Sequence, residues 1–108
     1  MRLSVILPAF HEEQVIGHVV KGIRDLYPDT TDVEVLVVDD GSRDGTADKA
    51  AGAGATVVRH PYNKGNGAAI KTGIRSSRGD VIVMMDADGQ HDPSEIPEFA
   101  AAFAKGGS

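Results

Sequence analysis

The chain has 108 residues, which is enough for one small domain and too few for two. Its 16 acidic and 11 basic residues give a net charge of -5, and such a chain lacks the basic face that nucleic-acid binding requires. It has no cysteine, which excludes disulfides and thiolate metal sites, and no apolar run approaches the about 18–20 residues of a transmembrane helix. We therefore expect a cytoplasmic globular protein that binds no nucleic acid.

Four short apolar runs rich in valine and isoleucine recur along the chain. They are nearly continuous and do not alternate with polar residues, which is typical of strands covered on both faces of a parallel sheet. The four predicted strands are Leu3–Leu7, Val33–Val38, Ala55–Val58 and Val81–Met85.

Helical patterns separate these runs. The predicted helices are Val15–Leu26, Asp44–Ala53 and Gly67–Ser77, followed by a last helix capped by Asp92, with an apolar stripe that ends at Phe103. Strands that alternate with helices predict an α/β fold: a Rossmann-like, doubly wound parallel sheet of about four strands with helices on both faces. Ligands of such sheets bind beyond the carboxyl ends of the strands, so the segments after each strand are the candidate site.

The most informative of these segments follows the fourth strand, where the apolar run ends in Asp86-Ala87-Asp88-Gly89-Gln90. Side chains at i and i+2 of an extended segment point the same way, so Asp86 and Asp88 can converge on one point. Hard oxygen ligands at this spacing suit a divalent cation that carries a substrate phosphate, and Gln90 adds a third oxygen in the same phase. The alternative is a pair of solvated turn residues or a helix cap.

A second acidic pair, Asp39 and Asp40, follows the second strand. Neighbours on an extended chain point to opposite faces, so one carboxylate can meet a ligand, such as the ring N–H of a base, while the other supports a turn. Ser42 or Asp44 can cap the next helix. Plain turn chemistry at Asp-Gly-Ser is the alternative for both aspartates.

A glycine-rich loop, Lys64-Gly65-Asn66-Gly67, opens the third helix. Such a loop can approach a phosphate closely, and Lys64 supplies positive charge. It is not a Walker A loop, and it follows the third strand and not the first, which argues against a dinucleotide fold. None of the four histidines has the partner spacing of a zinc helix site, and His18 is expected on a helix surface.

Four segments in order now make a recognisable set: Val5–Glu12, Val37–Thr46, Asn63–Ala69, and Gly79-Asp80 followed by Met85–His91. With them, the chain resembles the family 2 glycosyltransferases of the GT-A fold, and among these the dolichol-phosphate mannose synthase type. The resemblance covers essentially all 108 residues. Two departures are His11, where asparagine is common, and Gly89, where a larger residue is common.

The resemblance implies an enzyme that moves a sugar from a nucleotide diphosphate sugar, GDP-mannose or a UDP-sugar, to an acceptor such as polyprenyl (dolichyl) phosphate, by metal-assisted inverting displacement. It implies Mg²⁺ or Mn²⁺ held by Asp86, Asp88 and Gln90. The implied nucleotide-binding residues are Pro8, Ala9, Glu12, Asp39, Asp40, Lys64, Gly65, Asp86, Ala87 and Asp88.

Family 2 catalytic domains are about twice as long as this chain, so we expect residues 1–108 to be the nucleotide-sugar-binding part of a longer protein. The catalytic base and acceptor site are then expected beyond Ser108, and the chain alone should turn over poorly. The longer protein is compatible with association at the cytoplasmic face of a membrane, and an exposed sheet edge would favour homo-oligomers. Two alternatives are a non-catalytic nucleotide-binding module and a haloacid-dehalogenase-like phosphatase with Asp86 as nucleophile.

Overall fold

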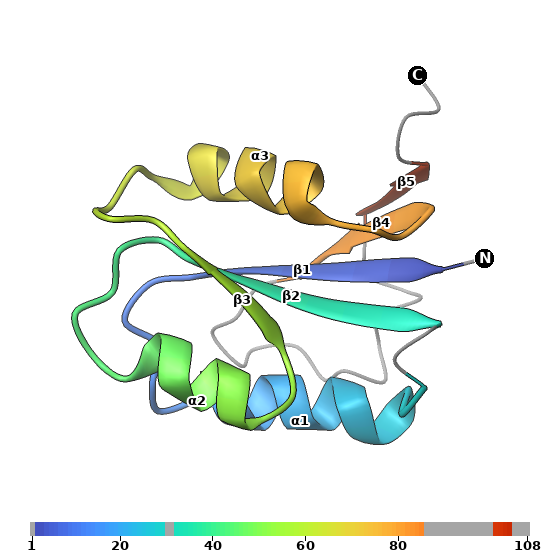
Figure 1. Ribbon diagram of the computed structural model, residues 1–108, viewed down its shortest axis with the longest axis horizontal. Coiled ribbons are helices and arrows are strands. Elements are labelled where there is room, and N and C mark those ends of the chain that lie inside the picture. Colours follow the sequence, from blue (N-terminus) through green and yellow to red (C-terminus); the bar gives the residue numbers. More distant parts are fainter. Residues whose placement is uncertain (1, 30–31, 86–100, 105–108) are drawn as a thin grey trace.

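The first four strands of the protein form a parallel sheet and the fifth closes one edge. The computed structural model describes residues 2–29, 32–85 and 101–104. Its strands are β1 (Leu3–Ala9), β2 (Val33–Asp39), β3 (Thr56–Arg59), β4 (Val81–Met84) and β5 (Ala101–Ala104), and its helices are α1 (Ile16–Leu26), α2 (Thr46–Gly52) and α3 (Asn66–Ser76). The strand order is β3-β2-β1-β4-β5, with β5 antiparallel to β4 (Figure 1).

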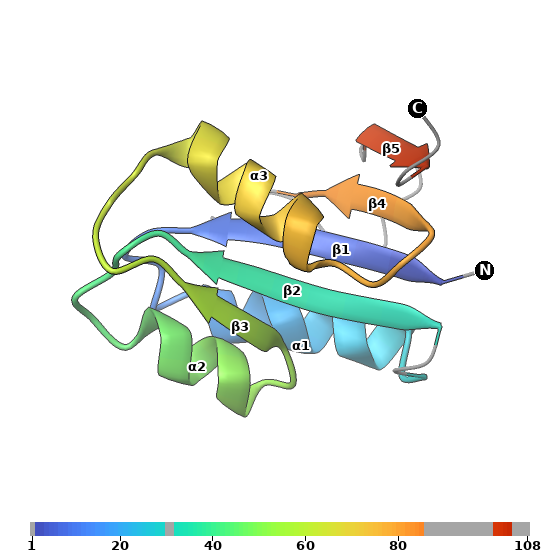
Figure 2. The same ribbon diagram turned by 45° about the horizontal axis from the view of Figure 1, so that its top comes forward.

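The helices cover both faces of the sheet, as the sequence predicts. Figures 1 and 2 show α1 and α2 below the sheet and α3 above it. Because strand side chains alternate between the two faces, Val5 and Leu7 pack in the cluster formed with α1, whereas Ile6 packs in the cluster that includes α3. The two clusters together make the core, and the α/β doubly wound fold is confirmed.

The path of the chain fixes where a ligand can bind. The chain runs outward from β1 through β2 to β3, and then crosses back through α3 to place β4 on the other side of β1. The arrowheads of β1 and β2 point the same way in Figure 2. Strand β4 is also parallel to β1, but the order in which the chain adds strands reverses between β1 and β4. In open α/β sheets the crevice at the carboxyl ends beside such a switch point is the usual ligand site.

One prediction about the C-terminal region is wrong. The predicted last helix extends to Phe103, but Ala101–Ala104 form β5, which places Phe103 opposite Ile82. Strand β4 would otherwise present an unpaired row of backbone groups, and pairing with β5 satisfies it. The rest of that predicted helix lies outside the described residues.

A buried polar cluster holds together the amino-terminal ends of the parallel strands, at the opposite end of the sheet from the carboxyl ends. Glu34 accepts hydrogen bonds from the Ser4 hydroxyl and from the Arg78 amide, both at 2.8 Å. The Ser4 oxygen in turn accepts from the Gly79 amide at 2.8 Å. These bonds join β1, β2 and the connection from α3 to β4, so this end is fixed internally. Among the described residues, no helix has the length and apolar character needed to span a membrane.

Candidate functional site

Three loops meet at the carboxyl ends of the parallel strands, called here the carboxyl edge of the sheet, and they line a cavity. They follow β1, β2 and β3, so the parallel arrangement brings together residues that are far apart in the chain. The cavity has a volume of about 640 Å³, enough for a small ligand. It is lined by Phe10, His11, Gly41, Ser42, Arg43, Arg59, His60, Pro61, Tyr62 and Asn63.

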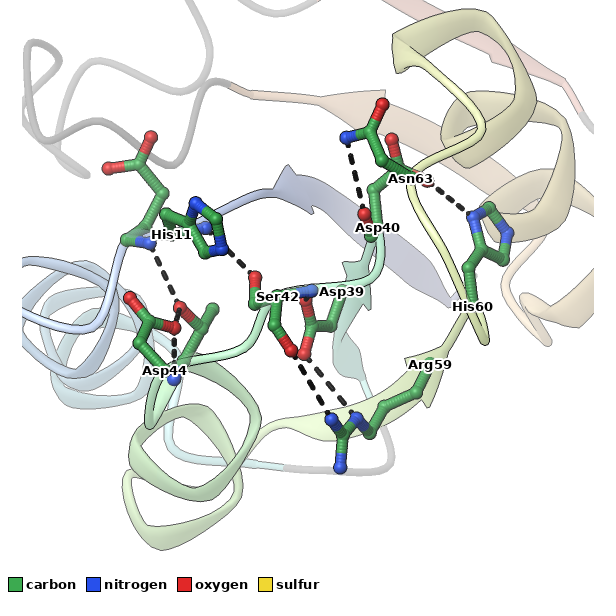
Figure 3. Close-up of polar contacts among 10 residues, drawn as sticks. His11, Asp39, Asp40, Ser42, Asp44, Arg59, His60 and Asn63 are labelled. Carbon is green, nitrogen blue, oxygen red and sulfur yellow. Dashed lines mark hydrogen bonds and ion pairs between the residues drawn. The ribbon is translucent and has the colours of Figure 1, made fainter.

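Asp40 is the hydrogen-bonding centre behind this cavity. Its Oδ1 accepts from the Nδ1 atom of His60 at 2.7 Å and from the amide of Lys64 at 2.9 Å, and its Oδ2 accepts from the amide of Gly65 at 2.8 Å. Its backbone carbonyl accepts from the Asn63 side chain at 3.3 Å. The carboxylate therefore fixes the loop after β3 to the end of β2 (Figure 3).

The protonation state of Asp40 follows from these contacts. Burial by itself would raise the pKa of Asp40, because it disfavours the charged form. The hydrogen bonds from His60, Lys64 and Gly65 outweigh burial, with further help from the charge of His60, and they lower the pKa below its ordinary value. Asp40 is therefore an ionised carboxylate at neutral pH and accepts hydrogen bonds without donating any.

His60 links this carboxylate to helix α3. It is buried, and while its Nδ1 atom faces Asp40, its Nε2 atom lies 2.8 Å from the Thr72 hydroxyl. Because an ionised carboxylate only accepts, Nδ1 must carry the proton that binds Asp40. Thr72 can then donate to Nε2 when the ring is neutral. The ring is held from both sides and cannot turn without losing a hydrogen bond.

Asp39 points to the other face of the sheet and has a different set of partners. Its side chain is 0% exposed, its Oδ1 accepts from the Ser42 amide at 2.9 Å, and its Oδ2 lies 3.5 Å from Nε of Arg59. Arg59 stands beside Asp39 in the register of β2 and β3, which places the opposite charges together. The Arg59 side chain is 59% exposed, and it both neutralises Asp39 and lines the cavity.

The loop after β1 is fixed by hydroxyl groups of the loop after β2. The His11 amide donates to the Ser42 hydroxyl at 2.8 Å, and the Glu12 amide donates to that of Thr46 at 2.9 Å. His11 has a φ of 53°, a left-handed conformation that asparagine and histidine adopt more readily than most residues. Asp44 accepts from the Thr46 hydroxyl and from its amide, and these bonds lower the pKa of Asp44.

The structure brings the described nucleotide-binding candidates to this one edge. Pro8 and Ala9 are the last two residues of β1, and Ala9 pairs with Asp39. Lys64 and Gly65 reach the site through their amides, which Asp40 holds. The predicted residues Asp86, Ala87, Asp88 and Gln90 lie outside the described residues, which on this side end at Met85 after β4. Within the described ranges no three acidic or histidine side chains form a metal-binding cluster.

Several residues of the site were not among the sequence candidates. Arg43 and Arg59 supply positive charge to the cavity wall, and the exposed ring of Tyr62 lies 5.3 Å from the Lys64 amine. His60 could have been found, because it directly follows the third strand. Thr72 lies inside α3 and gives no signal in the sequence.

Comparison with known proteins identifies the family. Residues 4–108 match the model of glycosyl transferase family 2. The dolichol-phosphate mannosyltransferase of Pyrococcus furiosus is 36% identical over an alignment of 114 residues, gaps included. The alignment covers 98% of this chain and 31% of that protein. The chain therefore belongs to glycosyl transferase family 2.

Solved structures agree with this assignment. Glucosyl-3-phosphoglycerate synthase from Mycobacterium tuberculosis, in complex with Mn²⁺, UDP-glucose and phosphoglyceric acid, is 33% identical with a TM-score of 0.76, covering 89% of this chain and 36% of that one. A mannosyltransferase from Pyrobaculum calidifontis in complex with GDP-mannose and Mn²⁺ is 29% identical with a TM-score of 0.74, covering 81% and 27%. The chain thus spans about a third of the length of these relatives.

Proposed function

We propose that this family 2 chain binds the nucleotide part of a nucleoside-diphosphate sugar, and that the protein to which it belongs transfers the sugar to an acceptor with inversion. The observation that carries the proposal is the cavity at the carboxyl edge of β1, β2 and β3, beside the strand that leads to Asp86 and Asp88. A base in this cavity would leave its diphosphate to extend toward that segment.

The proposed base and ribose contacts come from the carboxyl end of β1 and from the loops described above. Pro8, Ala9 and Glu12 line the nucleoside from the β1 side, and Asp40 accepts from the base. Asp39 supports the same turn from the other face, through its bond to the Ser42 amide. Lys64 and Gly65 close the site from the β3 side, which their amide bonds to Asp40 favour.

Asp86, Asp88 and Gln90 are proposed to hold Mg²⁺ or Mn²⁺, with Ala87 beside the nucleotide. Carboxylate and amide oxygens are suitable ligands for these ions, and both solved relatives above are complexes with Mn²⁺. A divalent cation, when bound, stabilises the negative charge of a departing nucleoside diphosphate. The described residues would bind and orient the nucleoside, so that the sugar is presented to the acceptor.

The proposed acceptor is a polyprenyl phosphate such as dolichyl phosphate. The Pyrococcus relative is named for a dolichol-phosphate acceptor, and a phosphate oxygen is already an anionic nucleophile, so it needs less help from a protein base. A lipid acceptor implies that the longer protein works at a membrane surface, and we propose its cytoplasmic face.

Binding and transfer can be tested separately. Isothermal titration of the 108-residue chain with UDP and GDP, with and without Mn²⁺, should show Mn²⁺-dependent binding that Asp88→Asn weakens at least tenfold. The exposed Asp25 on α1 provides the matched control variant, Asp25→Asn, which should bind like the wild type. Absence of nucleotide binding by the folded chain would overturn the proposal.

Transfer is measured with the longer protein, radiolabelled UDP-glucose or GDP-mannose, and a short-chain polyprenyl phosphate. Label in the lipid phase supports the proposed acceptor, whereas transfer to phosphoglycerate alone would overturn it. Nucleotide binding without any transfer would identify a non-catalytic module. Phosphate release from a generic phosphate ester, inhibited by beryllium fluoride, would identify a phosphatase instead.

A further inference from the structure

The acceptor capacity of Asp40 limits which base it can bind. A carboxylate has about four acceptor positions, two on each oxygen. The Oδ1 atom already accepts from His60 at 2.7 Å and from Lys64 at 2.9 Å, so its two positions are filled. Among the described residues, Gly65 alone donates to the Oδ2 atom, at 2.8 Å, which leaves one position on that oxygen. Asp40 can therefore accept from one further N–H group and not from two.

The Asp40 carboxylate lies directly behind the cavity wall. Its side chain is 6% exposed, and its partners His60 and Asn63, which Figure 3 shows beside it, both line the cavity, as does the adjacent Gly41. The cationic and amide side chains of this wall supply donors: the guanidinium groups of Arg43 and Arg59 and the amide nitrogen of Asn63. None of the described residues that line the cavity is acidic. The Asp40 carboxylate behind the wall is therefore the strong acceptor that we consider for a base.

The common bases differ in what they require of such a wall. Uracil presents one N–H between two carbonyl oxygens, which matches one acceptor flanked by donors. Guanine presents a ring N–H beside its 2-amino group and needs both oxygens of one carboxylate. Cytosine has no proton at N3, so it would direct a lone pair toward the charged carboxylate. Buried polar groups that remain unpaired weaken binding strongly, so these differences are large.

We infer that this site selects uracil nucleotides, and that His60 determines the choice because it occupies the Asp40 oxygen that guanine would need. The inference rests on the proposed function, since it requires that a nucleoside binds here through Asp40. Thr72 acts as a positioning residue, because its hydroxyl holds the ring with Nδ1 toward Asp40. The donor sugar would then be a UDP-sugar.

A ligand series tests the choice of base without any mutation. The 108-residue chain is titrated with UDP, CDP, GDP and IDP in the presence of Mn²⁺. CDP matches UDP in size but lacks the N3 proton, and IDP matches GDP but lacks the 2-amino group. We expect UDP to bind at least about tenfold more tightly than GDP and CDP. We expect IDP to bind at least about fivefold more tightly than GDP. GDP binding as tightly as UDP would overturn the inference.

Variants of His60 test its role. His60→Ala removes the donor and the ring that stand at the second position on Oδ1, so the 2-amino group of guanine can reach it and the affinities for GDP and IDP should become equal within about twofold. His60→Asn keeps an N–H near the place of Nδ1 and should restore the preference for IDP. His18→Leu, on the exposed face of α1, is the control and should leave the ratio unchanged. An unchanged ratio in His60→Ala would show that His60 does not set the specificity.

The outcomes separate the inference from the proposed function. If no nucleotide binds to a chain whose circular dichroism shows it folded, the proposed function fails and the inference fails with it. If nucleotides bind with GDP equal to or above UDP, only the inference fails. The ligand series with the wild-type chain decides between UDP and GDP by itself. The inference can therefore be refuted even if a His60 variant does not fold.

Discussion

Replacement of Gly41 by alanine should disrupt the loop that closes the cavity. Gly41 has a φ of 81°, and a Cβ atom there would lie 2.4 Å from the carbonyl carbon of Tyr62 and 2.5 Å from the Asn63 amide nitrogen. Ordinary contacts between carbon atoms are about 3.5 Å or longer, so the loop after β3 must move by about 1 Å. Both neighbours are backbone atoms, which cannot move aside by changing a rotamer.

The cost of Gly41→Ala follows from two contributions. The left-handed conformation costs an alanine about 1–2 kcal/mol. A loop shift of this size should also break one of the two amide bonds to Asp40, and a hydrogen bond to a charged group contributes about 1.5–3 kcal/mol. The free energy of unfolding should therefore fall by about 2.5–5 kcal/mol, a large share of the roughly 5–15 kcal/mol of a typical domain.

Two other glycines separate these contributions. Gly65 has a φ of 100° but nothing within 4 Å of its Cβ position, so Gly65→Ala should cost only the backbone strain, about 1–3 kcal/mol. Gly67 lies in α3 without positive φ or close neighbours, so Gly67→Ala should stabilise by about 0.5–1 kcal/mol. Urea unfolding followed by circular dichroism measures all three. A Gly41→Ala variant within 1 kcal/mol of wild type, by that measurement, would refute the reasoning.

Three further changes probe other parts of the fold. Ser4→Ala should destabilise by about 1–3 kcal/mol in urea unfolding, because it leaves buried Glu34 and the Gly79 amide short of a partner. Gly73→Ala should cost about 1–3 kcal/mol and lower the melting temperature, because its Cβ would lie 2.5 Å from Cγ2 of Ile6. The folded-state pKa of Asp40 lies below the unfolded value of about 3.9, so its contribution to stability is present above that pH and is lost as the pH falls through the folded-state pKa. Asp40→Asn should remove this acid-dependent loss.

Each of these changes has a matched control. Ser76→Ala, on the exposed end of α3, and Gly67→Ala should show no destabilisation. Asp25→Asn should retain the wild-type loss of stability between pH 5 and pH 3, as the midpoint of urea unfolding reports. If Asp40→Asn and Asp25→Asn gave the same slope with pH, the hydrogen bonds of Asp40 would not stabilise its charged form.

The strands and helices of this protein were predictable because their signals are local. The predicted strand Val33–Val38 is observed as Val33–Asp39, and the predicted helix Val15–Leu26 is observed as Ile16–Leu26. Continuous apolar runs imply burial on both faces, and β2 is buried along its whole length. Strand β3 is the exception, since it lies at the sheet edge and its ends are exposed. The expected exposure of His18 is confirmed.

The sequence by itself determined the four parallel strands, the family resemblance, and the strand ends at which acidic residues and glycines accumulate, because those features depend on neighbours in the chain. Only the tertiary structure decided how Asp39 and Asp40 divide their partners. Asp39 meets Arg59 and the Ser42 amide, whereas Asp40 meets His60 and two amides from the loop after β3. Apart from Ser42, these partners lie 20 or more residues from the aspartate that they contact, which leaves no periodic signal. The remaining acceptor capacity of a carboxylate can be counted only once those partners are placed.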